Sequence, residues 1–167
     1  MRKLMLVVLM AIASSAHAQQ IDLKVLDTIA AKAKSSTEIG MDEASLKAAA
    51  AAAEKGAKPG PVKNTTEGMK GFYLRSYEFN KGEFKWDDLK AFTDQLKAPS
   101  WVRFLKNKEQ NEQTEIWWHV TNGQTDGMLL ISVEEEEITV INAIGTSNLG
   151  DLSSLKNLGL ILNGGFK

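Results

Sequence analysis

The sequence predicts an α+β domain, with helices packed on one face of a mainly antiparallel sheet of about five strands. Apolar side chains recur at helical spacing up to about residue 55, and they alternate with a period of two from residue 69 onwards. In the second half of the chain, short polar links separate four apolar segments. Such links join neighbouring strands that run in opposite directions, so we expect an antiparallel sheet.

The first eighteen residues have the three parts of a secretory signal peptide. A basic start over residues 1–3 precedes an apolar run over residues 4–12, which is well short of the ~20 residues of a membrane-spanning helix. Ala16-His17-Ala18 is a small-x-small cleavage site. We therefore expect cleavage after Ala18 and a single α+β domain over residues 19–167. The mature protein should be periplasmic or secreted, without a membrane anchor.

A first helix is expected over residues 21–34. Its apolar stripe consists of Leu23, Leu26, Ala30 and Ala33. A serine-rich break follows, and residues 38–41 are expected to form a short extended piece. Residues 42–55 then predict a second helix, because Asp42 suits its N-cap and six consecutive alanines have the highest helix propensity. We expect this helix to lie over the sheet, and residues 56–66 to form a linker rather than a domain boundary.

Residues 69–79 are rich in aromatic side chains that alternate with a period of two, which is typical of a strand. A third helix is expected over residues 86–96, and a strand over residues 101–105. This strand–helix–strand unit could place two strands parallel in the sheet. Further strands are expected over residues 114–121, 128–133 and 138–144, followed by a C-terminal helix that starts at Asn148 or Asp151 and turns Leu149, Leu152 and Leu155 inward.

Few side chains of the mature chain suit catalysis. His119 is its one histidine and cysteine is absent, so zinc sites and hydrolytic triads lack their usual groups. Carboxylates at Asp87, Asp88, Asp126 and residues 134–137 could act on glycans, but a helix start and solvated turns explain them as well. No phosphate-binding glycine motif or nucleophile elbow is present. We predict no catalytic residue, no metal site and no cofactor.

The charge of the mature chain also limits its partners. Removal of residues 1–18 takes away two of the 20 basic residues and no acidic residue, which leaves a formal charge of −3. Nucleic acids and anionic membranes both select basic surfaces. We therefore expect neither as a partner.

Residues 115–121 give the most distinctive surface signal. The face of this strand that we expect in the core comprises Ile116, Trp118 and Val120. Trp117 and His119 lie on the other face, which should be wetter. If helices cover only one sheet face, Trp117, His119, Met128 and Leu130 form a partly apolar binding patch. The alternative is that the C-terminal helix or the N-terminal segment covers these residues.

Several segments together resemble a known family. They are residues 127–133 (GMLLISV), 138–145 (ITVINAIG), 148–155 (NLGDLSSL), 26–33 (LDTIAAKA) and 71–79 (GFYLRSYEF), with Trp101 opening a strand. The pattern resembles the bacterial domain-of-unknown-function family numbered 4252 over most of the mature chain. The resemblance implies a small exported bacterial protein, often a lipoprotein, without an assigned activity or functional residues. This chain departs from the lipoprotein members because it lacks cysteine.

These observations favour a non-enzymatic periplasmic or secreted module that binds another protein of the cell envelope. One alternative is a carboxylate-only hydrolase that acts on glycans, and a second is a structural subunit of an envelope assembly. The sequence leaves the oligomeric state open.

Overall fold

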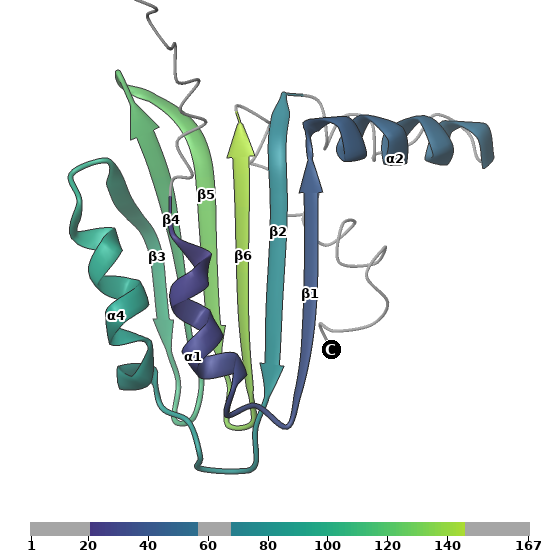
Figure 1. Ribbon diagram of the computed structural model, residues 1–167. Helices are drawn as coiled ribbons and strands as arrows, with labels where there is room; N and C mark the ends of the chain where they lie inside the picture. Colours follow the sequence, from purple (N-terminus) through teal and green to yellow (C-terminus); the bar gives the residue numbers. More distant parts are fainter. Residues whose placement is uncertain (1–20, 57–67, 146–167) are drawn as a thin grey trace, which may run out of the picture.

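The computed structural model describes residues 21–56 and 68–145, with the side chains of residues 53–56 excepted. These residues form a six-stranded open antiparallel sheet and three short helices (Figure 1), so the α+β prediction is confirmed. The strand order is β1-β2-β6-β5-β4-β3. The elements, with η for 3-10 helices, are η1 (Leu23–Leu26), α1 (Asp27–Ala30), β1 (Ser35–Asp42), α2 (Glu43–Gly56), β2 (Met69–Glu78), η2 (Trp86–Leu89), α4 (Lys90–Thr93), η3 (Asp94–Lys97), β3 (Trp101–Lys108), β4 (Gln113–Thr121), β5 (Gln124–Val133) and β6 (Glu137–Gly145).

The sixth strand is β1, which extends the predicted piece over residues 38–41 in both directions. It pairs with β2 from Ser35, opposite Glu78, to Asp42, opposite Gly71. The preceding helical segment ends at Ala30, earlier than predicted. Residues 35–37, which the sequence predicts to be a break between two elements, are thus part of a strand because their backbone pairs with β2.

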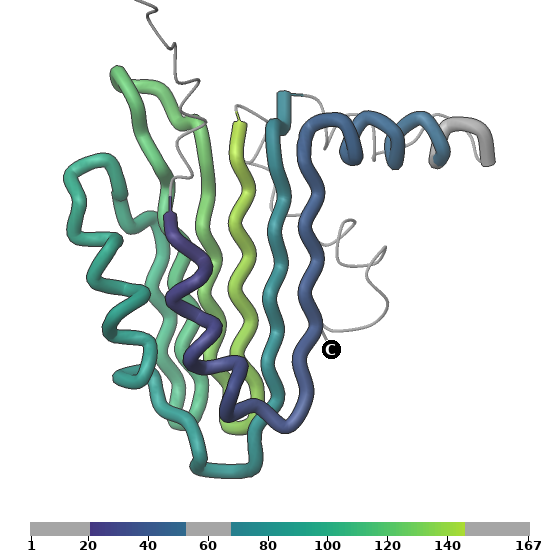
Figure 2. The backbone as a smooth tube through the Cα atoms, viewed as in Figure 1, coloured from purple at the N-terminus to yellow at the C-terminus, as the bar shows by residue number. Residues whose placement is uncertain are grey.

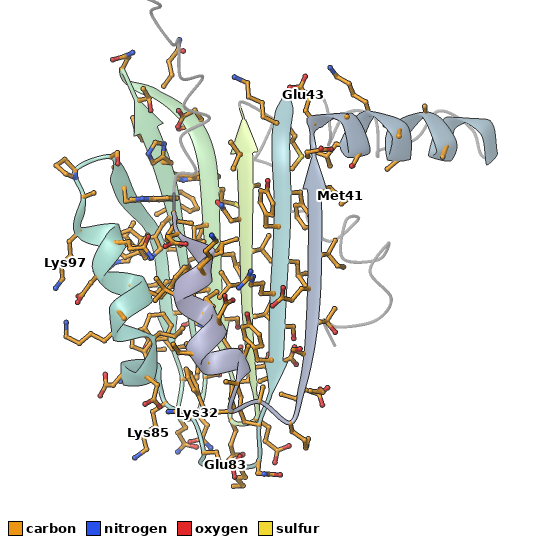
Figure 3. All side chains as sticks on the ribbon, in the orientation of Figure 1. Lys32, Met41, Glu43, Glu83, Lys85 and Lys97 are labelled. Carbon is orange, nitrogen blue, oxygen red and sulfur yellow. The ribbon has the colours of Figure 1, made fainter. Side chains whose placement is uncertain are left out.

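The helical segments η1–α1 and η2–α4–η3 pack on one face of the sheet, which we call the helix-covered face (Figure 1). Figure 3 labels Lys85 and Lys97 at the two ends of the second segment. Each segment contributes buried apolar side chains to a shared core, namely Leu23, Leu26 and Ile29 from the first and Leu89, Phe92 and Leu96 from the second. The expectation that helices pack on one face therefore holds for these two segments.

The alanine-rich helix α2 does not lie over the sheet, contrary to the prediction. It begins as expected, because the Asp42 carboxylate accepts a hydrogen bond from the Ser45 backbone N–H at 2.8 Å. It then projects away from the sheet edge beyond β1 (Figure 2), and Met41 and Glu43 mark this junction in Figure 3. Leu46 is buried, whereas alanines 48–52 are exposed or half-buried. Backbone propensity forms this helix, but alanine side chains offer little apolar area for packing.

Strands β2 and β3 run in the same direction, as the strand–helix–strand interpretation allowed. They are not neighbours, because β6, β5 and β4 lie between them. Every neighbouring pair in the sheet is antiparallel. The helical crossover therefore spans most of the sheet, and this is why it covers that face.

The opposite side of the sheet, called here the second face, is also apolar. Its buried core comprises Leu46, Met69, Phe72, Leu74, Ile116, Met128, Ile141 and Ala143. Among these, Leu46 is the one residue that a described helix contributes. The predicted C-terminal helix and all of the predicted linker except Gly56 lie outside the described residues.

None of the helices in residues 21–56 and 68–145 combines the length and the apolar composition that a membrane span requires.

Candidate functional site

Strand β3 forms one edge of the sheet, so among residues 21–56 and 68–145 no strand pairs with the outer side of its backbone. Seven of its eight residues are exposed, and Trp101 at its start is buried. An edge strand presents unpaired N–H and C=O groups to any extended segment that approaches it. This edge is therefore available for an interaction by backbone pairing.

The exposed large hydrophobic residues found among residues 21–56 and 68–145 all lie on β3. Val102 is 50%, Phe104 58% and Leu105 37% exposed. Val102 lies opposite Trp118 on the second face, and the centroid of the Phe104 ring is 5.5 Å from the centroid of the half-buried Trp118 ring. The pairing of β3 with β4 is interrupted by a bulge between Arg103 and Leu105, and Phe104 is the extra residue of this bulge. We call Val102, Phe104, Leu105 and Trp118 the β3 strip.

On the helix-covered face, the neighbouring strand β4 holds a buried carboxylate. Glu115 is 3% exposed and accepts hydrogen bonds from Gln113 Nε2 and Trp117 Nε1, both at 3.0 Å. Lys106 Nζ lies 3.2 Å and the Arg103 guanidinium 3.8 Å from its Oε1 atom. Arg103 also stacks over the Trp117 ring, with its Cζ atom 5.3 Å from the ring centroid. Burial of this charge is compensated, and the cluster fixes the Trp117 ring instead of leaving it free for a ligand.

The structure does not bring the predicted patch together. Met128 lies opposite Trp118, so Met128 and Leu130 lie on the second face, where Met128 is fully buried and Leu130 half-buried. Trp117 and His119 lie on the helix-covered face, which we had expected to be the wetter one. Alternation along a strand fixes which residues share a face, but the register between strands and the position of the helices decide which face is covered.

His119 forms a dyad with Asp126 at one end of the sheet. The distance from His119 Nδ1 to Asp126 Oδ1 is 2.6 Å, and the Trp101 ring packs edge-on against the imidazole at 4.9 Å between centroids. Burial alone would raise the pKa of Asp126, but hydrogen bonds from His119 and Thr121 outweigh this effect and leave the pKa below its ordinary value. This pair resembles the base and orienting acid of a hydrolytic triad. In the described part of the chain, however, no hydroxyl side chain hydrogen-bonds to His119.

Among the carboxylates considered for glycan hydrolysis, Asp126 does not converge with residues 134–137. Asp126 lies near the start of β5, and residues 134–137 follow the other end of the same strand. Eight residues of strand correspond to roughly 26 Å, far more than the ~5–10 Å between the carboxylates of glycosidases. Asp88 has a structural role, because its carboxylate accepts a hydrogen bond from the Lys85 N–H at 2.8 Å. Within the described ranges, no group of three or more acidic or histidine side chains could hold a metal ion.

A cavity of about 370 Å³ lies between η1 and the β1–β2 edge and is lined in part by Lys24, Glu38, Tyr73 and Arg75. The Arg75 guanidinium donates to the Leu23 carbonyl at 2.9 Å and to Asp27 at 2.7 Å, and it lies 3.7 Å from Glu38. The arginine of this cavity thus holds η1 and α1 against the sheet, and its charge is already compensated.

One buried polar side chain of the helix-covered face is left without partners. Within the described residues, both amide atoms of the fully buried Asn142 lack hydrogen bonds, whereas the hydroxyl of the equally buried Tyr77 interacts with the Arg75 guanidinium without a hydrogen bond of standard geometry. Such orphaned groups are rare in folded proteins. Neither residue was identified from the sequence, because their burial depends on the packing of the helices.

Sequence reasoning also missed the β3 strip. Residues 101–105 were predicted as a strand, but the sequence does not reveal which strand lies at an edge. The available signal was the pair Lys106 and Lys108 directly after the apolar run, since edge strands are often protected by lysine.

Comparisons with known proteins give one match. The model of a family described as "Domain of unknown function (DUF4252)" matches residues 31–155, from just before β1 to ten residues beyond the end of β6. No curated protein and no solved structure matches the chain.

Proposed function

The chain belongs to the DUF4252 family, and from this premise we propose that it is a non-enzymatic binding module, exported to the bacterial envelope, that captures a partner protein through the β3 strip. The family description assigns no activity. The proposal therefore depends on the surface chemistry of this chain.

One observation carries the proposal, namely the exposure of Phe104 and Val102 beside the Trp118 ring. Single exposed hydrophobic residues are common on soluble proteins. Here three of them lie on one strand and adjoin a half-buried tryptophan, and a contiguous exposed apolar patch of this kind marks an interaction site.

Charge and backbone geometry indicate the chemistry of the partner. A segment that adds to the edge of β3 would meet apolar side chains on the second face and the cations Arg103, Lys106 and Lys108 along the same strand. Glu115 offsets one of these three charges, so the edge keeps a net positive charge. Two β3 edges would bring these like charges together, which disfavours pairing between two copies. The surface fits an extended segment with apolar residues on one side and acidic residues on the other.

Export is the second part of the proposal and is supported by the sequence of residues 1–18. The basic start, short apolar run and Ala16-His17-Ala18 site have the order and length of a cleaved signal peptide. A chain without cysteine also cannot form incorrect disulfides under the oxidising conditions outside the cytoplasm.

In-cell crosslinking tests the binding function. A photo-crosslinking residue replaces Phe104 on the β3 strip, and a matched one replaces Thr37, which is exposed on the opposite edge strand. We expect adducts with a specific envelope protein from position 104 and not from position 37. In the otherwise unmodified chain, Phe104→Ser should lower recovery of the same partner by at least about tenfold, because a buried aromatic anchor contributes ~2 kcal/mol or more.

Equal adducts from both positions, or partner recovery unchanged by Phe104→Ser, would refute the role of the β3 strip. Turnover of a glycan by the purified protein, abolished by Asp126→Asn, would favour the hydrolase alternative. Sedimentation of the native protein with a large envelope complex would favour a structural subunit.

A further inference from the structure

The centre of the second face is buried, although the described helices leave it uncovered. Met128 and Ala143 are 0% exposed and Phe72 is 1% exposed. Their strand neighbours shield them from the sides, but side chains stand perpendicular to a sheet, so only another layer can cover their ends. Leu46 reaches this core from α2, beyond the β1 edge. A further layer must therefore lie over β2, β6 and β5.

This layer stops before the β3 edge. On the same face, Val102 is 50% and Phe104 58% exposed, whereas Met128, two strands away, is fully buried. The boundary between covered and uncovered surface thus lies close to Trp118, which is half-buried.

We infer that residues 146–167 dock on the second face across β2, β6 and β5 and leave the β3 strip free. This segment begins directly after Gly145, at the end of the strand that lies between β2 and β5. Leu149, Leu152 and Leu155 recur at helical spacing and provide an apolar stripe. The family match ends at residue 155, so the folding unit that the family shares includes these three leucines.

The length of the segment fits the face that it would cover. A helix from residue 148 to residue 162, before Asn163-Gly164-Gly165, would be about 22 Å long, and the nine residues of β6 span roughly 30 Å, so such a helix covers most of the strand. One such helix, about 10 Å wide with its side chains, covers two to three strands spaced ~4.8 Å apart. This width accounts for a cover that ends before β3.

The other parts of the chain outside the described ranges fit this face poorly. After cleavage behind Ala18, only two residues precede Ile21, which lies in the core of the helix-covered face. Residues 57–67 carry a single large apolar residue, Val62, among prolines, lysines and polar residues. Residues 146–167 contain seven leucine or isoleucine residues.

Thiol labelling of the full-length mature protein tests this docking, because the parent chain has no cysteine. Met128→Cys places a thiol on the second face, and Leu129→Cys places one next to it in sequence on the helix-covered face. Each is combined with Leu152→Asp/Leu155→Asp, or with the control pair Ser154→Asp/Asn157→Asp, which adds the same charge on the other side of the stripe. We expect the leucine changes to speed labelling at position 128 by at least tenfold and the control pair to leave it unchanged.

Labelling at position 129 should stay slow in all combinations, which separates loss of the cover from unfolding. If Leu152→Asp/Leu155→Asp speeds labelling at both positions, the milder change Leu155→Ala is used in its place. We then expect faster labelling at position 128 alone. Fast labelling of Met128→Cys in the parent, or a rate unaffected by either leucine change, would overturn the inference. Protection that increases with protein concentration would assign the cover to a second copy and overturn it too. None of these outcomes depends on the β3 strip or its partner.

Discussion

Replacement of Asn142 by leucine should stabilise the protein. Asn142 lies in β6 on the helix-covered face, opposite Tyr73 on β2 and Leu129 on β5. It is 0% exposed, and neither Nδ2 nor Oδ1 has a hydrogen-bond partner in the part of the chain that the structure describes. Leucine has the same number of side-chain heavy atoms and branches at the same carbon, so the substitution removes the polar groups, and its bulkier methyl groups require a small local repacking.

The expected magnitude follows from the cost of burying an unpaired amide. Protein mutational data place that cost at about 1–3 kcal/mol. Asn142→Leu should therefore raise the free energy of unfolding by about 1–3 kcal/mol. For a chain of about 150 residues, each kcal/mol raises Tm by roughly 2–4 °C.

Urea unfolding of the mature protein measures this change. If the slope of the unfolding free energy against urea concentration is the same in parent and variant, the shift of the unfolding midpoint reports the change in stability. Thr139→Val on the same strand is the matched control. Thr139 is 9% exposed, but its hydroxyl donates to Glu137 at 3.0 Å, so this change should destabilise by about 0.5–1.5 kcal/mol. Destabilisation of 1 kcal/mol or more by Asn142→Leu would refute the reasoning and point to a buried water bound by the amide.

Two further predictions concern the contacts of Arg75 with η1 and α1 and the His119–Asp126 pair at one end of the sheet. Arg75→Met removes the hydrogen bond to the Leu23 carbonyl, so the free energy of unfolding should fall by about 0.5–1.5 kcal/mol. Amide hydrogen exchange should become faster first in residues 23–30, and an exchange rate there equal to that of the parent would contradict the role of Arg75 in holding η1 and α1. Asp126→Asn should lower stability at pH 7, because the depressed pKa of Asp126 means that folding favours its charged form. The contribution of Asp126 to stability is present above the ordinary pKa of 3.8 and is lost as the pH falls through the depressed pKa. The free energies of unfolding of parent and variant, measured with urea, should therefore converge in acid. A difference that stays constant with pH would contradict the depressed pKa of Asp126.

The sequence predicted those elements whose own residues carry a strong signal. The period-two segments at β2, β4 and β6 were identified to within one residue at each end, whereas β5 begins four residues before the predicted start at Met128. The helix predicted over residues 86–96 is present as the successive short segments η2, α4 and η3. Short polar links then required antiparallel pairing, since a crossover needs more residues. The helix α2 was likewise predicted, because alanine propensity acts locally.

Strand β1 shows where local signals end. Its first residues, Ser35, Ser36 and Thr37, carry no apolar alternation and are exposed. They are extended because β2 supplies hydrogen-bond partners for their backbone. That contribution comes from a segment about 40 residues further along the chain and leaves no mark in the local pattern.

The candidate site was harder to predict for the same reason. The sequence by itself determined the fold class and which side chains of each strand share a face, because side-chain alternation is a property of the backbone. Only the tertiary structure decided that Trp117 and Met128 lie on opposite faces, that β3 is an edge, and that Phe104 is exposed. These facts depend on strand register, strand order and helix placement, which arise from contacts between segments distant in sequence.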